Sequence, residues 1–231
     1  MAKTSTRQRC GSRFLAILVD LDNTLYDFGY AKEQACREVV QTLGVGNTDD
    51  LVRAFLFSPF GVENTNVIQL YLRDMGITDT QTVMHAIEVY TQAKLKAIHP
   101  YPGVYETLQR IHAAGIKIGA VTNAHTVHAS ERLAHIQIDD LFDCIVTPDI
   151  TGLKKPDPAM FLHAASLLKI QPHQICVIGD NLINDIKPAQ ETGMYTIHAE
   201  YGNRLPAEYA EGIIADFTIS SFSHILQILG L

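Results

Sequence analysis

The chain has 231 residues, of which 47% are apolar and 19% are charged, as is ordinary for a globular protein. Its formal net charge is −7 and it contains no basic run, which argues against a nucleic-acid partner. No apolar stretch is long enough to cross a bilayer, so we expect no membrane partner.

Cysteine usage and the first residues indicate where the protein works. The four cysteines, Cys10, Cys36, Cys144 and Cys176, lack the spacing of a disulfide framework or a zinc ribbon. Residues 1–13 are basic and rich in Ser and Thr but contain no apolar segment, so we expect a short flexible tail rather than a secretory signal. Both features favour a cytoplasmic protein.

An apolar run at 14–19 predicts a buried strand of a parallel sheet that ends at Asp20. Apolar residues then recur at helical spacing, and turn signals, among them the one at 58–61, separate the segments. The predicted helices are 31–43, 50–57, 66–75 and 81–98. We expect the aromatic residues Phe55, Phe57, Tyr71 and Tyr90 to lie in the core of this helical part.

After Pro100 the pattern changes to alternating strands and helices. Strands are predicted at 117–121, 143–146, 175–178, 195–198 and around Phe217. Helices are predicted at 104–113, 127–135, 158–168, 183–192 and 222–229. This alternation is typical of parallel β-α-β units. We therefore predict an α/β fold, with a doubly wound parallel-sheet (Rossmann-like) core and an inserted all-helical cap. The expected domains are a tail at 1–13, a core at 14–27 and 100–231, and a cap at 28–99.

Polar residues follow several of the predicted strands. They are Asp20, Asp22, Thr122, Asn123, Lys155, Asp180 and Asp185. Each alone is explained by a turn, a helix cap or a solvated loop, but in an open parallel sheet the carboxyl ends of the strands meet at one edge. Carboxylates brought together there would repel one another without a cation, and a set of hard oxygen ligands suits Mg²⁺.

These residue types also suit phosphoryl transfer. One carboxylate can attack phosphorus to form an acyl phosphate, and a second, two residues further on, can protonate the leaving oxygen and later activate water. A hydroxyl, backbone N–H groups and a lysine can hold the phosphoryl oxygens.

The motifs resemble those of the haloacid-dehalogenase-like hydrolase superfamily, in its subclass with a small helical cap. They read Asp20-Leu21-Asp22-Asn23-Thr24-Leu25, Val121-Thr122-Asn123, Lys155-Pro156-Asp157-Pro158 and Gly179-Asp180-Asn181-Leu182-Ile183-Asn184-Asp185. The resemblance covers the chain from about residue 14 onward. It implies that Asp20 is the nucleophile and a magnesium ligand. It also implies that Asp22 is the general acid and base and lends its backbone carbonyl to the metal.

The resemblance implies roles for the remaining residues as well. Thr122 and Asn123 would hold the transferring phosphoryl group, and Lys155, rather than Lys154, would neutralise charge around it. Asp180 would bind the metal directly, and Asp185 would bind it through water or orient its neighbours.

The resemblance thus implies a magnesium-dependent phosphatase for a small phosphorylated metabolite, such as a sugar phosphate or nucleoside monophosphate. We expect it to act through an aspartyl-phosphate, as a monomer or homodimer. A phosphomutase with the same core chemistry is the main alternative. A haloacid dehalogenase is less favoured because such enzymes lack the second aspartate of the first motif, here Asp22. A non-catalytic binding module is less favoured because it would be expected to lose Asp20, Asp22 or Asp180.

Overall fold

The computed structural model describes residues 14–58 and 64–231. The predicted tail at 1–13 and most of the predicted turn at 58–61 lie outside the described residues. Contacts divide the chain into two compact units. The α/β unit combines the chain up to Leu25 with Pro100–Leu231, and the helical unit is Tyr26–His99. The first boundary falls two residues before the expected one.

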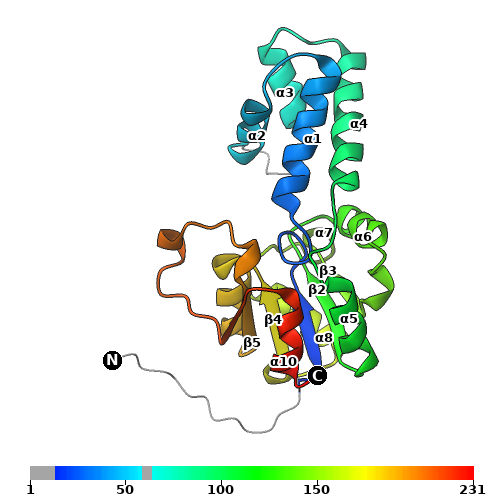
Figure 1. The fold of residues 1–231 in the computed structure, drawn as a ribbon. Helices are drawn as coiled ribbons and strands as arrows, with labels where there is room; N and C mark the ends of the chain where they lie inside the picture. Colours follow the sequence, from blue (N-terminus) through cyan, green and yellow to red (C-terminus); the bar gives the residue numbers. More distant parts are fainter. Residues whose placement is uncertain (1–13, 59–63) are drawn as a thin grey trace. The chain divides into compact units, whose positions relative to one another are not determined.

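The α/β unit contains a six-stranded sheet within the described residues (Figure 1). Its strands are β1 (Ala16–Val19), β2 (Lys117–Val121), β3 (Cys144–Val146), β4 (Ile175–Gly179), β5 (Tyr195–Ala199) and β6 (Phe217–Ile219). Its α-helices are α5 (Val104–Ala113), α6 (Thr126–His135), α7 (Pro148–Thr151), α8 (Ala159–Leu168), α9 (Lys187–Glu191) and α10 (Ile225–Leu229).

All six strands are parallel, in the order β3-β2-β1-β4-β5-β6. Helix α8 packs on β1, β2 and β3, while α5 and α10 contact each other and α5 contacts β2 (Figure 1). Every residue of β1 is fully buried, as expected for a central strand with both faces covered. Ala16 and Leu18 join the core cluster that includes Met160 and Phe161 of α8, which leaves Ile17 and Val19 for the opposite face. The predicted α/β class with a helical insertion is confirmed.

The helical unit consists of α1 (Phe28–Leu43), α2 (Thr48–Leu56), α3 (Asn66–Asp74) and α4 (Thr80–Lys96) among its described residues. Asp27, Asn47 and Asp79 cap α1, α2 and α4, each side chain accepting from backbone N–H groups of the first turn. Gly44 ends α1 with φ +67°, a left-handed conformation in which a side chain is strained.

The aromatic residues expected in the core of the helical unit do not all lie there. Phe55 and Tyr90 are fully buried and stack with ring centroids 4.7 Å apart, and Tyr71 is partly buried. Phe57, however, is 84% exposed. Residues two apart on a helix face opposite directions, and α2 ends at Leu56, so Phe57 cannot share the buried face of Phe55.

The predicted helix at 183–192 also differs in detail. It begins as a π-helical turn, η3 (Leu182–Ile186), and continues as the short helix α9. Pro188 lacks the N–H that an uninterrupted α-helix would use. Helix α7 was not predicted; it starts at Pro148 and ends at Thr151, and Gly152, which caps it, adopts φ +71°. In the described part of the chain, no helix combines the length and hydropathy needed to span a membrane.

Candidate active site

The carboxyl ends of β1 and β4 bring the first and last motifs side by side. The two strands pair in register, with Val19 opposite Ile178, and the next N–H, that of Asp20, donates to the carbonyl of Ile178 at 2.9 Å. Asp180 directly follows β4. Because the order of the strands reverses around β1, this edge is where a doubly wound sheet binds its ligand.

Three carboxylates gather at this edge. Oxygens of Asp20, Asp180 and Asp185 all lie within 4.8 Å of one another, and all three side chains are buried. Nζ of Lys155 donates to Oδ1 of Asp20 and, at 2.7 Å, to Oδ1 of Asp185. Lys154 is exposed, whereas Lys155, the second lysine of the pair, lies beside the carboxylates.

Burial controls the ionisation of this cluster. Loss of solvent raises the pKa of Asp20 from 3.8 to about 7, although the nearby Lys155 ammonium opposes the shift. Burial, together with the charges of Asp20 and Asp185, raises the pKa of Asp180 to about 9. The neighbouring carboxylates raise the pKa of Lys155, which keeps its ammonium charged despite burial.

The cluster fits a hard divalent cation. Its donors are carboxylate oxygens that converge on one point, and a single ammonium group contacts two of the three. A second positive charge would favour the ionised form of all three carboxylates. Oxygen donors of this kind are the ligands that Mg²⁺ prefers.

Gly179 creates the space that Asp185 occupies. A Cβ at Gly179 would lie 2.4 Å from the Cβ, Cγ and Oδ2 atoms of Asp185, too close for any other residue type. The Oδ2 atom of Asp185 in turn accepts from the N–H of Asn181, whose side chain caps the π-helical turn. The glycine and the turn together aim Asp185 back at the strand ends.

Thr24 ties the first motif to the last. Its hydroxyl oxygen accepts from the N–H of Asp180 at 3.0 Å and lies 3.5 and 3.4 Å from carboxylate oxygens of Asp20 and Asp180. Asn23, just before it, adopts φ +62°, an uncommon conformation for a residue with a side chain. The loop thus turns sharply to return Thr24 to the cluster.

Asn123 is engaged with the backbone of Lys155. Its Nδ2 donates to the carbonyl of Lys155 at 3.1 Å, and its Oδ1 accepts from the N–H of Lys155 at 2.8 Å. Its side chain therefore fixes the position of the lysine. The Thr122 hydroxyl is buried and accepts from the N–H of Ala124, which leaves its own proton available to a ligand oxygen.

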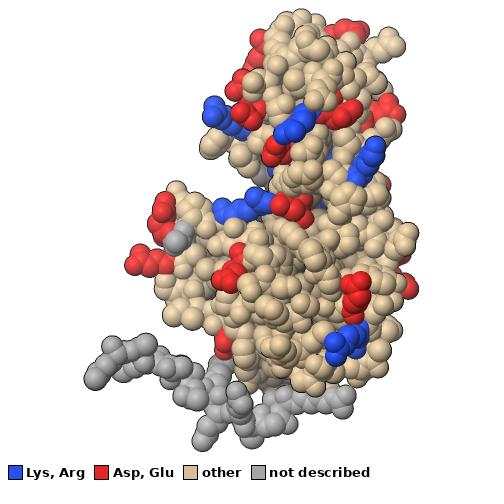
Figure 2. Space-filling model, in the orientation of Figure 1, with Lys and Arg blue, Asp and Glu red and all other residues tan. Residues whose placement is uncertain are grey.

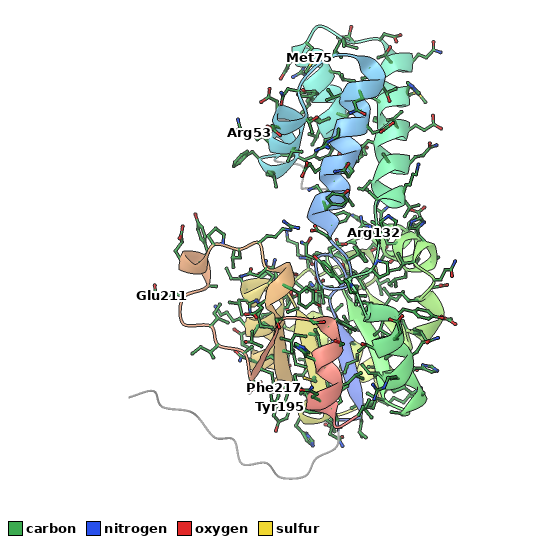
Figure 3. The ribbon with its side chains drawn as sticks, viewed as in Figure 1. Arg53, Met75, Arg132, Tyr195, Glu211 and Phe217 are labelled. Atoms are coloured by element: carbon green, nitrogen blue, oxygen red, sulfur yellow. The ribbon has the colours of Figure 1, made fainter. Side chains whose placement is uncertain are left out.

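Asp22 does not join the three clustered carboxylates. Its two oxygens instead accept from Nη1 of Arg132, at 2.9 and 3.0 Å. Arg132 belongs to α6 (Figure 3), and its side chain is only 2% exposed. The carboxylate of the predicted acid and base thus lies apart from the three clustered carboxylates, while its backbone carbonyl stays a predicted metal ligand.

Strand β5 and the segment after it contact the loops of the first and last motifs. The Tyr201 hydroxyl donates to the carbonyl of Thr24 at 2.7 Å, and Nε2 of His198 donates to the carbonyl of Asp180 at 3.0 Å. Gly202 lies so close that an added Cβ would sit 1.8 Å from the carbonyl oxygen of Asn23. The tyrosine and histidine side chains bond the carbonyls of Thr24 and Asp180, which lie beyond the strands and are not part of the sheet's hydrogen bonding.

Sequence reasoning missed Thr24, Arg132, His198, Tyr201 and Gly202 as parts of this site. Arg132 had a readable signal, because it stands three residues after Ala129 and one before Leu133, on the apolar face of a helix. A charge on such a face needs a buried partner. The contacts of Tyr201 and Gly202 join positions about 180 residues apart and had no local signal.

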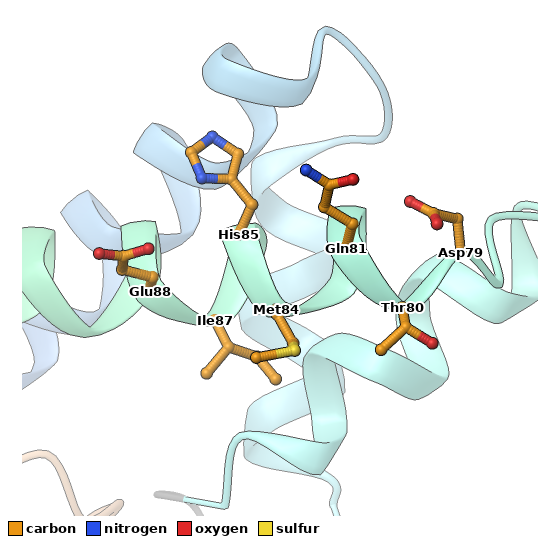
Figure 4. Close-up of a pocket in the computed structure, with 7 residues that line it drawn as sticks. All are labelled: Asp79, Thr80, Gln81, Met84, His85, Ile87 and Glu88. Atoms are coloured by element: carbon orange, nitrogen blue, oxygen red, sulfur yellow. The ribbon is translucent and has the colours of Figure 1, made fainter.

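A hollow in the helical unit is lined by none of the predicted site residues. In the helical unit, a shallow hollow of about 820 Å³ is lined by Asp79, Thr80, Gln81, Met84, His85, Ile87 and Glu88 (Figure 4). On the face drawn in Figure 2, basic and acidic side chains are interspersed, without a broad basic patch.

The sequence was compared with known protein families and with known proteins. The sequence pattern described as haloacid dehalogenase-like hydrolase matches residues 17–199. The chain is 29% identical to a glyceraldehyde 3-phosphate phosphatase of Methanopyrus kandleri, over 93% of this chain and 96% of that protein. It is also 29% identical to a phosphoglycolate phosphatase of Nitrosospira multiformis, over 81% of this chain and 83% of the relative.

A solved structure shows the same fold. The HAD-hydrolase YfnB from Bacillus subtilis, in a crystal structure bound to magnesium, superimposes with a TM-score of 0.74 at 19% identity. The match covers 95% of this chain and all of YfnB. An α/β core with a helical insertion is therefore shared with that solved structure.

Proposed function

Because the chain belongs to the haloacid dehalogenase-like hydrolases, we propose that it is a magnesium-dependent phosphatase of small phosphate monoesters. The observation that carries the proposal is the buried group of Asp20, Asp180, Asp185 and Lys155 at the carboxyl edge of the sheet. This group combines a carboxylate nucleophile with the positive charge that phosphoryl transfer requires.

In the first step, an oxygen of Asp20 forms a bond to phosphorus while the bond between phosphorus and the leaving oxygen breaks. The leaving oxygen takes a proton from Asp22, and an aspartyl-phosphate remains on Asp20. The Lys155 ammonium contacts the Asp20 carboxylate and favours its ionised form against the effect of burial, and the Thr122 hydroxyl can donate to a phosphoryl oxygen.

In the second step, water attacks phosphorus and gives its proton to the Asp22 carboxylate. The bond between phosphorus and Asp20 breaks, which releases inorganic phosphate and restores both side chains. We assign the metal to the oxygens of Asp20, Asp180 and Asp185, with the backbone carbonyl of Asp22. When bound, Mg²⁺ supplies charge that neutralises the phosphoryl oxygens and the carboxylates.

The relatives guide the proposal for the substrate. They are phosphatases of glyceraldehyde 3-phosphate and of phosphoglycolate, both small phosphate monoesters. We infer that this chain takes a small phosphorylated metabolite of that kind, in the cytoplasm, as a monomer or homodimer. Residues 28–99 are proposed as a cap domain that selects the leaving group, and residues 14–27 and 100–231 as the catalytic core.

The proposal is tested by phosphate release from a panel that includes glyceraldehyde 3-phosphate, phosphoglycolate and p-nitrophenyl phosphate, with Mg²⁺ or with EDTA. We expect release that requires Mg²⁺ and that falls about 10⁴-fold or more in Asp20→Asn. Asp140→Asn is the matched control, because Asp140 is an exposed aspartate of the same unit. Full activity in EDTA or in Asp20→Asn would contradict the proposal, and conversion of a sugar phosphate to its isomer without phosphate release would favour a mutase.

A further inference from the structure

Arg132 is a buried cation outside the predicted motifs. It lies in α6, the helix that follows Thr122 and Asn123, and its flanking residues Ala129 and Leu133 are fully buried. A buried guanidinium loses its hydration, so it is tolerated only where strong acceptors replace the lost water. The packing of α6 therefore fixes Arg132 more firmly than a surface arginine could be fixed.

Of the two side chains in this ion pair, Arg132 is the more restricted and Asp22 the more exposed. The Asp22 side chain is 22% exposed, whereas that of Arg132 is 2% exposed. Both oxygens of Asp22 accept from one nitrogen, Nη1, at 2.9 and 3.0 Å, and charge-assisted bonds of this length are strong. The rotamer of the more exposed carboxylate is thus set by a side chain that cannot itself move freely.

The position matters because Asp22 stands two residues from the nucleophile. In the described residues, the clustered ligand oxygens come from Asp20, Asp180 and Asp185, and the Asp22 carboxylate is not among them. A carboxylate released at this place could turn toward a cation and act as a further ligand, which would remove it from proton transfer.

We propose that Arg132 is a positioning residue that holds the Asp22 carboxylate outside the metal cluster and in place for proton transfer. This inference rests on the proposed function. Arg132 neither gives nor takes a proton: Asp22 passes its proton to the leaving oxygen as the bond to phosphorus breaks, Arg132 holds the resulting carboxylate, and that carboxylate then takes a proton from the attacking water.

The test compares two leaving groups in each variant. p-Nitrophenolate departs readily without a proton, whereas the alkoxide of phosphoglycolate needs one, so loss of proton transfer lowers kcat/KM selectively for the alkyl ester. We expect Asp22→Asn and Arg132→Gln each to lower kcat/KM at least about tenfold more for phosphoglycolate than for p-nitrophenyl phosphate. The ratio of the two values does not depend on the folded fraction, so a destabilised variant still gives an answer.

Two further variants sharpen the result. Arg132→Lys should recover part of the alkyl activity, because a single nitrogen makes both bonds to Asp22. Arg132→Gln in an Asp22→Asn background should change the ratio no further, because the carboxylate it positions is already gone. Arg110→Gln, which replaces an exposed arginine of α5, is the control and should keep the wild-type ratio.

The inference is overturned if Arg132→Gln lowers both activities by the same factor, or if its effect is as large in the Asp22→Asn background. The first result would show that Arg132 serves packing alone, and the second would show that it does not act through the Asp22 carboxylate. If the wild-type protein releases no phosphate from any ester in the panel, the proposed function fails instead, and the two failures are therefore distinguishable. Should phosphoglycolate be a poor substrate, glyceraldehyde 3-phosphate provides the alkyl leaving group.

Discussion

The two units bury different kinds of side chains. Among the described residues, the buried polar and charged side chains of the α/β unit include Asp20, Lys155, Asp180, Asp185 and Arg132, whereas the helical unit contributes Lys94. The core of the helical unit is otherwise built from aliphatic and aromatic residues such as Leu51 and Leu72. The helical unit is thus held together mainly by apolar packing, while the α/β unit contains charged side chains whose burial costs free energy.

This difference separates residues that mainly stabilise the fold from residues that take part in the proposed reaction. Apolar burial stabilises a fold in proportion to area and needs no precise partner. Buried charges stabilise only when each finds its partner, and here several partners belong to the proposed reaction. Substitutions in the helical unit should therefore change stability, and substitutions of the buried charges should change activity and its dependence on pH and metal.

The largest expected effect is a dependence of metal-free stability on pH. Burial raises the pKa of Asp20 to about 7 and that of Asp180 to about 9, so the folded protein keeps protons that the unfolded chain releases above about pH 4. In EDTA, the free energy of unfolding should then fall as pH rises from 5 to 8, by up to about 1.4 kcal/mol per pH unit for each carboxylate. Thermal unfolding at several pH values measures this slope.

Asp180→Asn should flatten that slope, because it removes the group with the more strongly raised pKa. Mg²⁺ should raise Tm more at pH 8 than at pH 5, since a cation binds the ionised carboxylates. Equal slopes in the wild-type protein and the variant would show that these carboxylates do not govern the stability of the α/β unit.

The next largest effect is expected in the helical unit, from Leu51→Ala. Leu51 is fully buried in its apolar core, so truncation should lower the free energy of unfolding by about 3 kcal/mol through lost burial and a residual cavity. Leu56, on the same helix but 58% exposed, is the matched position, and Leu56→Ala should cost less than about 0.5 kcal/mol. Urea unfolding followed by circular dichroism compares them; similar losses would contradict the apolar-core description.

The smallest expected change in stability comes from Gly202→Ala, although its effect on activity is direct. The new methyl group would meet the backbone carbonyl of Asn23 at 1.8 Å, so the loop of the first motif must shift. We expect a loss of about 1–3 kcal/mol and a lower kcat. Gly115→Ala is the control, because a Cβ at Gly115 would meet nothing within 4 Å and only the backbone conformation, φ +76°, would be strained. It should cost about 1 kcal/mol and leave activity per folded molecule unchanged.

Most of the architecture could be predicted from local pattern. The strands at 117–121 and 175–178 and the helices at 104–113 and 66–75 stand within one residue of their predicted positions, because apolar periodicity reports directly on burial. The exceptions have local causes that compete with periodicity. Phe57 lies just past the end of α2, and Pro188 interrupts the helix that follows the last motif.

The sequence by itself determined the family, the parallel sheet and the strand ends that Asp20, Thr122 and Asp180 follow, because the order of motifs and strands along the chain can be read directly from it. The tertiary structure alone decided which partners these groups meet. Asp185 reaches the cluster through the space at Gly179, and Asp22 turns to Arg132, 110 residues away. Such pairings join residues that are distant in the sequence, so no local pattern indicates them. They form in the folded molecule because a buried charge needs a partner that neutralises it.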